Sequence, residues 1–441
     1  MNRNAQIARR SLRRAVPALA AVAVIAAVAL AGCSSSGSSD GGVTTIKVLN
    51  WEPGGTAYWK ATVAAFEKVN PDIKVALETV PNDKYAEVQG PYITSKSGPD
   101  VMASNAGLEL FDRRSAYVPI PSDVRKVAGD LLTYSGACLN FDVKQDCYGL
   151  PFSYQGNVMY YNKTILKAAG VDADRPPKTW DEMNGACKAV EAIGKTCLAL
   201  GMTGQFPAYW DFPEVARNYL TEADMREVLA GKMKWTDPKM VQILTAMADI
   251  SKRGWANKNA PSISMLPDAA DIFQSGKAAF AGTIISDAVN WSVFGPALGE
   301  ENLGAMSWPM INTAAPLAGK FSGIEGSVMG VTQWSQHKDA GFKFVEWMAG
   351  SENAALWSSI AKGISLNTKV GTSSLPKSQA LTQILQLIKQ PTLHVGVMLS
   401  GAEADALARG WQQATLGQID VKGWTAQMET ALENSPGKAQ K

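Results

Sequence analysis

The cysteine at position 33 lies in a context that predicts covalent modification of its thiol. A basic stretch that ends at Arg14 is followed by an uncharged, alanine-rich run, which closes with Leu30-Ala31-Gly32-Cys33. The pattern resembles a bacterial lipobox, in which the thiol receives a diacylglycerol and the preceding peptide is cut away. The small residues before the cysteine suit a peptidase that needs room at its cleavage site. We therefore expect residues 1–32 to be a signal peptide and Cys33 to be lipidated.

A run of serine and glycine follows this cysteine, so residues 33–43 are expected to form a flexible tether. The alternative is a plain transmembrane anchor, which is disfavoured because the apolar run is short and leads directly into the tether. Arg9-Arg10-Ser11-Leu12 hints at a twin-arginine signal, but Arg13 stands where an apolar residue is wanted, so both export routes stay open. The expected location is the outer face of a bacterial cell membrane, held there by lipid.

If Cys33 carries lipid, four cysteines remain, and they fall into two local pairs. Cys138 and Cys147 are nine residues apart, and Cys187 and Cys197 are ten residues apart. Such pairs usually oxidise outside the cytoplasm, so each pair is predicted to form a disulfide. The alternative is a zinc site, but zinc clusters favour spacings of about two to four residues within a pair.

Composition and charge narrow the possible classes of function. The chain has 441 residues, and the 409 that follow the signal peptide suffice for two or three domains. Because the first 32 residues hold five arginines and no acid, the remainder carries 37 basic and 40 acidic residues. A nucleic-acid partner would need a basic face, so none is expected. The two histidines, His337 and His394, lie in no motif, and no metal or cofactor is expected.

A β-α-β unit is predicted at the start of the mature chain. Thr45–Trp51 reads as a strand, and a helix should run from about Ala57 to a stop at Asn70-Pro71. Residues 73–77 alternate as in a strand, and residues 101–103 read as another strand. A right-handed crossover would make the strands parallel.

Polar and aromatic residues follow two of these strands. Ligands of such sheets bind beyond the carboxyl ends of the strands, which places Trp51, Glu52 and Asn105 at the edge of a site. Further helices are indicated by a capping box at Thr179–Glu182 and by Asp237-Pro238. The alternation of helices and strands predicts an α/β architecture.

Several short stretches, in the same order across nearly all of the mature chain, resemble the family 1 extracellular solute-binding proteins, the group like maltose-binding protein. They are Phe66–Val75, Ser97–Val101, Tyr148–Pro151, Tyr160–Lys163, Pro177–Glu182, Phe273–Phe280 and Ala340–Trp347.

This resemblance implies a two-lobed periplasmic-binding-protein fold of the class II type, with a ligand cleft between the lobes. The first lobe would comprise residues 44–152 and 321–365, and the second residues 153–320 and 366–441, with crossings near Phe152, Phe321 and Leu366. The lobes would close on a small-molecule ligand, and the closed form would dock on an ABC permease that works with a separate ATPase. The chain itself would be a monomer and not an enzyme.

Carbohydrate recognition needs flat aromatic faces for the C–H faces of a sugar ring and polar groups for its hydroxyls. The loop Phe206–Asp211 offers Tyr209, Trp210 and Asp211, and the resemblance makes it a cleft segment. The other ligand contacts that the resemblance implies, besides Trp51, Glu52 and Asn105, are Asp287, Trp291, Glu325 and Trp411.

Two other functions stay open at this point. A secreted glycoside hydrolase would need a pair of carboxyl groups spaced for acid and nucleophile roles, and no motif supports one. A binding protein for another solute, such as a glycerophosphodiester, a peptide or a polyamine, is the second. A polyamine site would want several acids in the cleft, and a phosphodiester site would want a positive or amide-rich cleft. The many aromatic residues favour a sugar.

Overall fold

Two β-sheets organise this protein, a computed structural model of which describes residues 42–435 apart from 52–54, 82–83 and 286–289. The described residues belong to one compact unit. The predicted signal peptide, the lipidated Cys33 and most of the tether therefore lie outside the described residues. Within the described part of the chain, no helix combines the length and the apolar character needed to cross a membrane.

The first sheet has the strand order β2-β1-β3-β10-β4. Parallel pairing joins β1 to β2 and to β3, while β10 is antiparallel to β3 and β4. This confirms the predicted β-α-β unit. The strands are β1 (Thr44–Asn50), β2 (Ile73–Thr79), β3 (Val101–Ser104), β4 (Leu150–Pro151) and β10 (Val328–Val331), and the helices of the same segments are α1 (Gly55–Val69), α2 (Tyr85–Ser95), α3 (Leu108–Asp112), α11 (Lys338–Ala349) and α12 (Ser351–Leu356).

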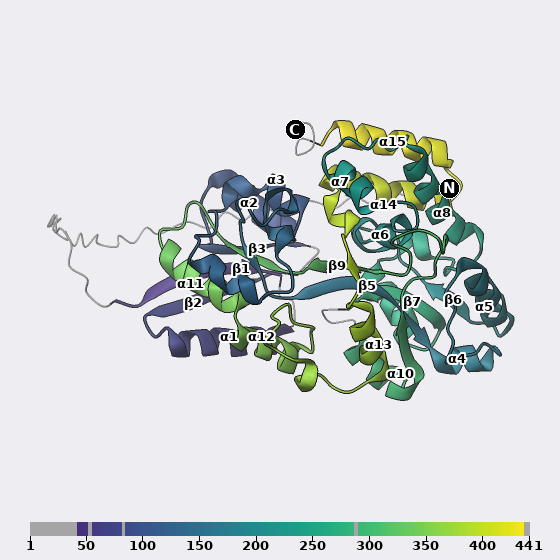
Figure 1. Cartoon of the computed structure of the whole chain (residues 1–441), viewed down its shortest axis with the longest axis horizontal. Coiled ribbons are helices and arrows are strands. Elements are labelled where there is room, and N and C mark those ends of the chain that lie inside the picture. The colour runs from purple at the N-terminus through teal and green to yellow at the C-terminus, as the bar shows by residue number, and fades with distance from the viewer. Residues whose placement is uncertain (1–41, 52–54, 82–83, 286–289, 436–441) are drawn as a thin grey trace, which may run out of the picture. The chain divides into compact units, whose positions relative to one another are not determined.

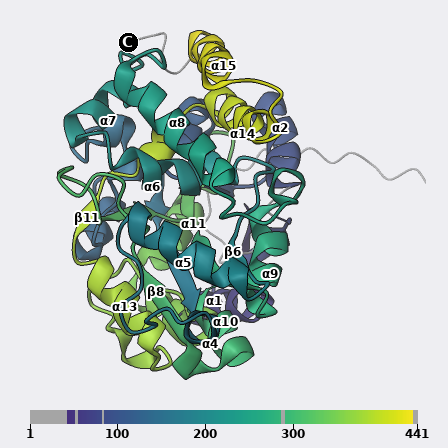
Figure 2. The same ribbon diagram turned by 90° about the vertical axis from the view of Figure 1, so that its right-hand side faces the viewer.

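The second sheet has the order β11-β9-β5-β7-β6, and β8 pairs with β5. Its strands are β5 (Tyr154–Asn162), β6 (Thr196–Ala199), β7 (Ala278–Ile284), β8 (Leu303–Met306), β9 (Phe321–Glu325) and β11 (Pro391–Thr392). The helices of these segments are α4 (Lys163–Ala168), α5 (Trp180–Ala192), α6 (Phe212–Ala216), α7 (Glu222–Leu229), α8 (Pro238–Lys252), α9 (Ala270–Gln274), α10 (Trp291–Leu298), α13 (Gln379–Leu387), α14 (Gly401–Thr415) and α15 (Val421–Glu433). Figure 2 shows α5, α6 and α8 on the face turned to the viewer.

Aromatic side chains pack against each of the two sheets. Every fourth residue of α1 is buried from Tyr58 through Thr62 to Phe66, and the ring of Phe66 meets Phe344 of α11 edge-on at 5.1 Å. Around the second sheet, the ring of Phe294 lies 5.3 Å from Tyr160 and 5.0 Å from Phe273. The regions around the two sheets are called the first and second lobes below, and their buried side chains join in one continuous hydrophobic cluster.

The chain passes between the sheets at three segments that lie side by side. The N–H of Gly326 donates to the carbonyl of Ser153 at 2.8 Å, and the N–H of Phe152 donates to the carbonyl of Ser327 at 3.2 Å. The third segment joins them where the N–H of Tyr154 donates to Ile364. In Figure 1, β5 and β9 run from the side of β1 and β3 toward β7.

We propose lobe boundaries within these segments, close to the expected Phe152, Phe321 and Leu366. The strand β9 pairs with β5 and β11 of the second sheet, so the return to the first sheet comes after Glu325 rather than at Phe321.

Both predicted disulfides are present, Cys138–Cys147 and Cys187–Cys197. The second pins the middle of α5 to β6, and both of its cysteines are buried. The predicted capping box of α5 is also present, because Thr179 Oγ1 accepts from the N–H of Glu182 and the Glu182 carboxylate accepts from the N–H of Thr179.

Removing the second disulfide should destabilise the protein without abolishing the fold. The double variant Cys187→Ala/Cys197→Ala frees a loop of about ten residues, which corresponds to roughly 2–3 kcal/mol of unfolding free energy. Equilibrium denaturation under oxidising conditions measures this loss. A thiol assay on the unreduced, denatured wild-type protein is the control, and free thiols at these two positions would contradict the pairing.

Candidate ligand-binding site

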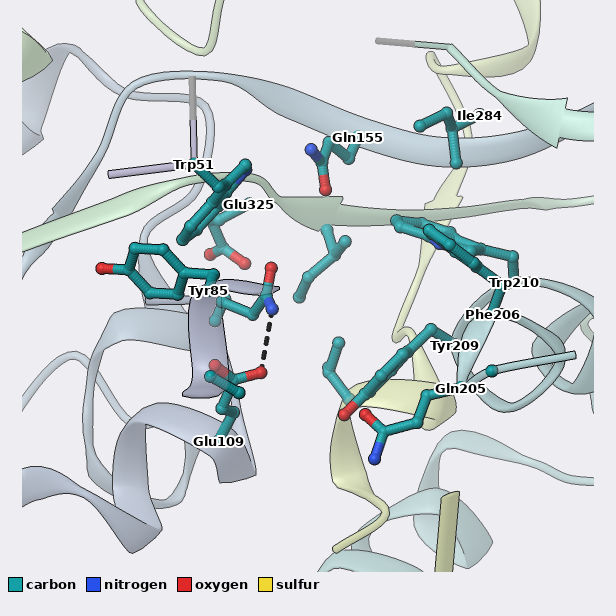
Figure 3. Close-up of a pocket in the computed structure, with 16 residues that line it drawn as sticks. Trp51, Tyr85, Glu109, Gln155, Gln205, Phe206, Tyr209, Trp210, Ile284 and Glu325 are labelled. Carbon is teal, nitrogen blue, oxygen red and sulfur yellow. Dashed lines mark hydrogen bonds between the residues drawn. The ribbon is translucent and has the colours of Figure 1, made fainter. Parts of the chain in front are cut away.

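A pocket of about 400 Å³ lies where segments of both lobes meet. Trp51 and Asn105 stand just beyond the carboxyl ends of β1 and β3, while Ile284 and Glu325 end β7 and β9. The pocket therefore occupies the carboxyl edge of the strands, as expected for sheets of this kind. Figure 3 shows Trp51, Tyr85 and Glu109 on one side and Phe206, Tyr209 and Trp210 on the other.

The first wall is built from Trp51 and Tyr85. Their rings meet edge-to-face with centroids 5.0 Å apart, a favourable arrangement for two aromatic quadrupoles. The hydroxyl of Tyr85, on α2, donates to the carbonyl of Ala103 at 2.7 Å, which ties this helix to the end of β3. The ring of Tyr85 is thus held at the ends of β1 and β3, next to the ring of Trp51.

The second wall comes from η6 (Pro207–Asp211), a single wide turn of π-helix that continues into α6. Such turns insert an extra residue and often occur at functional sites, because they redirect side chains. Trp210 is fixed from behind, since its carbonyl accepts from Asn157 Nδ2 at 2.8 Å and its indole meets the ring of His394 edge-on at 5.3 Å.

The polar groups of the pocket are largely engaged with one another. Glu109 accepts from Asn105 Nδ2 at 2.8 Å and from the Arg113 guanidinium at 2.9 Å. Gln205 donates to Asp405 at 2.8 Å. Oε1 of Glu325 accepts from Thr133 and other groups of the first lobe. These bonds fix the polar side chains before any ligand arrives.

The described lining of the pocket has an acidic character. It includes the carboxylates Glu109 and Glu325 and contains no lysine, arginine or histidine. Burial raises the pKa of the Tyr209 phenol, and the nearby Glu109 carboxylate raises it further. Tyr209 is therefore a neutral hydroxyl that can donate and accept hydrogen bonds. No grouping of histidine, cysteine, aspartate and glutamate suited to a metal ion occurs among the described residues.

The structure brings five of the predicted site residues together at the pocket, namely Trp51, Asn105, Tyr209, Trp210 and Glu325. Two others, Glu52 and Asp287, lie outside the described residues. The remaining three, Asp211, Trp291 and Trp411, do not line the pocket.

Helix packing explains where the two tryptophans lie. Trp411 is fully buried where α14 packs against α8 and α15, and its Nε1 donates to the carbonyl of Met247 at 2.9 Å. Trp291 is the first residue of α10, which packs against β8 and α9, and 1% of it is exposed. The expected stacking on a ligand is thus replaced by core packing in this structure.

Asp211 is buried in the second lobe rather than at the pocket surface. Burial, with a smaller effect of the neighbouring Glu214 carboxylate, raises the pKa of Asp211 well above its usual range. Neither of its carboxylate oxygens has a hydrogen-bond partner in the described part of the chain. Burial of this kind favours the protonated form of the carboxyl group over the anion.

Several lining residues escaped the sequence analysis. Phe206 and Gln205 adjoin the aromatic loop and could have been found by extending that segment. Tyr85 and Glu109 sit on helices whose pattern gives no such signal, and they reach the pocket because those helices pack beside the strand ends. Gln155 and Val397 line the pocket because of how the two lobes meet, which the sequence does not show.

His394, whose ring packs against Trp210, predicts a pH dependence of the stability of the protein. His394 is fully buried, both ring nitrogens lack partners among the described residues, and burial lowers its pKa to about 3. The unfolded chain binds a proton at His394 near pH 6.5, whereas the folded chain does not. The contribution of His394 to the free energy of unfolding is therefore fully present above about pH 6.5. It falls by about 1.4 kcal/mol for each pH unit of acidification below that.

Denaturation of wild type and His394→Gln between about pH 6.5 and 4 measures this effect. The free energy of unfolding should fall more steeply with acidification in the wild type, and the variant should lack that part of the slope. His337→Gln, at the exposed histidine, is the matched control. Equal slopes for wild type and His394→Gln would refute the assignment.

Known proteins were compared with the chain in sequence and in structure. The sn-glycerol-3-phosphate-binding periplasmic protein UgpB of Brucella abortus (strain 2308) is 27% identical over 215 residues, 42% of this chain. UgpB of Yersinia pestis bv. Antiqua is 31% identical over 110 residues, which is 24% of each chain. The chain spans about half the length of the curated relatives that it matches, 47% in the Brucella protein.

Solved structures resemble nearly the whole described part. A chitin oligosaccharide binding protein has a TM-score of 0.75 and 16% identity, covering 89% of this chain and 99% of its own. Maltose-bound MalE3 of T. maritima has a TM-score of 0.72 and 19% identity, covering 89% and 100%. These likenesses establish the two-lobed periplasmic-binding-protein fold, as predicted.

The family comparison covers the segments that build the pocket from Trp51 to Glu325. The profile of the bacterial extracellular solute-binding proteins matches residues 50–355, well over half of the chain. The resemblance in the sequence is thereby confirmed, and the chain belongs to the family of bacterial extracellular solute-binding proteins.

Proposed function

We propose that this protein captures a carbohydrate in the pocket between its lobes and delivers it to an ABC permease in the membrane. The observation that carries the proposal is the pair of opposed aromatic walls, Trp51 with Tyr85 and Phe206 with Tyr209 and Trp210. Aromatic faces pack against the apolar C–H faces of a sugar ring, while amides and carboxylates bond its hydroxyls. Asn105, Gln155 and Glu325 offer such polar groups in the same pocket.

Glycerol 3-phosphate is the main alternative, because it stands in the name of the UgpB relatives. A phosphate would need arginine, lysine or the N-terminus of a helix to balance its charge. The described lining has no basic side chain, and Arg113 is already bound to Glu109. Two carboxylates in the lining would repel a phosphate further, which favours a sugar without negative charge over this anion.

Capture would proceed by closure of the lobes about the three crossing segments. Ligand contacts with both walls are complete only in the closed form, so binding shifts an open–closed equilibrium toward closure. In this proposal Cys33 carries lipid, the serine–glycine tether keeps the lobes near the membrane, and a separate ATPase drives the permease. The tether would raise the local concentration of the loaded protein at its partner.

A ligand screen distinguishes the two solute classes. Malto-, xylo- and chito-oligosaccharides, glycerol 3-phosphate and a glycerophosphodiester would each be added to the mature protein, followed by thermal unfolding. A saccharide that binds the folded state should stabilise it by about 2.7 kcal/mol at 100 times its Kd. A shift with the phosphate compounds and none with saccharides would reject the carbohydrate proposal. Release of shorter sugars would instead indicate a hydrolase.

Two tryptophan variants distinguish a residue that contacts the ligand from a residue of the core. Trp210→Ala should weaken binding of the saccharide found in that screen by roughly tenfold or more, because an entire stacking face is removed. Trp411→Phe is the matched control, since it alters a buried tryptophan of the same lobe and should lower stability while leaving affinity unchanged. Calorimetric titration and thermal unfolding give the two readouts. A loss of affinity in Trp411→Phe but not in Trp210→Ala would show that Trp411, and not Trp210, contacts the ligand.

A further inference from the structure

Glu325 is the most deeply buried carboxylate of the pocket lining, with 3% of the residue exposed. It ends β9, one residue before the chain crosses toward the first sheet. Its Oε1 accepts from Thr133 Oγ1 at 2.5 Å, from the N–H of Gly136 at 3.1 Å and from Ser135 Oγ at 3.4 Å. One oxygen of the carboxylate is thus saturated by the first lobe.

The other oxygen, Oε2, receives no donor from the described part of the chain. Gly136 leaves space for it, since a Cβ at that position would lie 2.7 Å from Oε2. In Figure 3 the carboxyl group lies on the same side of the pocket as Trp51 and Tyr85. An acceptor that no described residue bonds, at the wall of a cavity, is a position for a ligand donor.

The donors on Glu325 are all uncharged, so they do not neutralise it. The second carboxylate of the lining, Glu109, is already paired with Arg113 at 2.9 Å. No lysine, arginine or histidine of the described chain lines the pocket to balance Glu325. A buried carboxylate is costly to leave without a positive charge, and a ligand can supply that charge.

The neighbouring rings favour the same kind of ligand group. Trp51 and Tyr85 stand on the side of the pocket from which Glu325 projects. The faces of tryptophan and tyrosine rings attract cations, and this attraction grows where water is excluded. Aromatic rings beside a carboxylate with a free oxygen form a site for an ammonium group.

We propose that the saccharide of this protein carries a protonated amine, and that its ammonium group donates to Oε2 of Glu325. This inference rests on the proposed function, because it specifies the chemical class of the sugar. A hydroxyl could also donate to Oε2, but it would leave the negative charge of Glu325 unbalanced. Glu325 would then be the specificity-determining residue of the pocket.

Matched ligands test the inference on the wild-type protein. Chitosan oligosaccharides and N-acetylated chitin oligosaccharides of the same length differ at the amine, which acetylation makes uncharged. Calorimetric titration at about pH 6, where the amine is protonated, should give at least about tenfold tighter binding of the amine form. Equal or tighter binding of the acetylated form, or of a neutral malto-oligosaccharide, overturns the inference while the carbohydrate proposal stands.

A charge-removing variant tests the role of Glu325. Glu325→Gln should lower the affinity for the amine form at least about tenfold and change that for the acetylated form much less. Glu346→Gln, at an exposed glutamate of α11, is the matched control for the loss of one negative charge. An unchanged preference in Glu325→Gln overturns the inference, and the ligand comparison above decides it should this variant fail to fold.

Two further probes keep the failure of this inference apart from failure of the proposed function. Spermidine supplies ammonium groups without a sugar, and glycerol 3-phosphate supplies the opposite charge. Binding of spermidine without any saccharide would overturn both the carbohydrate proposal and the amine-bearing sugar. Binding of glycerol 3-phosphate alone would do the same and would place the anion-binding alternative first.

Discussion

The backbone hydrogen bonds between the crossing segments are the constraint on which the rest of the structure depends. Gly326 donates to Ser153, and Phe152 donates to Ser327, so two strands pass from lobe to lobe in contact. Glycine suits this close contact, because a Cβ at position 326 would lie 2.0 Å from the Ser153 hydroxyl oxygen, which would have to move. The same register sets Tyr154 opposite Glu325, which brings the carboxylate to the pocket.

Local chemistry accounts for what could be predicted from the sequence. The β-α-β unit is marked by alternation, by helical spacing and by the Asn70-Pro71 stop, which act within a few residues. The disulfides followed from the local spacing of the cysteines together with the expected location outside the cytoplasm, where such pairs oxidise. Trp51 and Asn105 were placed by a general rule about strand ends, and the pocket lies at that edge.

What failed depends on contacts between distant segments. Both Trp411 and Trp210 were expected to contact the ligand. The helix α14 turns Trp411 inward against α8, while a π-helical turn holds Trp210 beside the pocket. Tyr85 gave no signal, because a helix pattern does not say which strand end the helix will pack beside. The identity of the solute could not be predicted for the same reason. One two-lobed fold hosts many ligands, and the residues that line the pocket determine which ligand binds.

The position of Glu325 next to a crossing segment also fixes the order in which contacts would part when the lobes swing open. A group beside the axis of rotation moves little, whereas Trp210 and Trp51, on opposite lobes, move apart. Because Oε1 is bonded to Thr133 and Gly136 of the first lobe, this carboxylate would keep its place as the aromatic walls separate. A departing solute would lose its stacking contacts first and its polar anchor last, and the anchor would set the time of release.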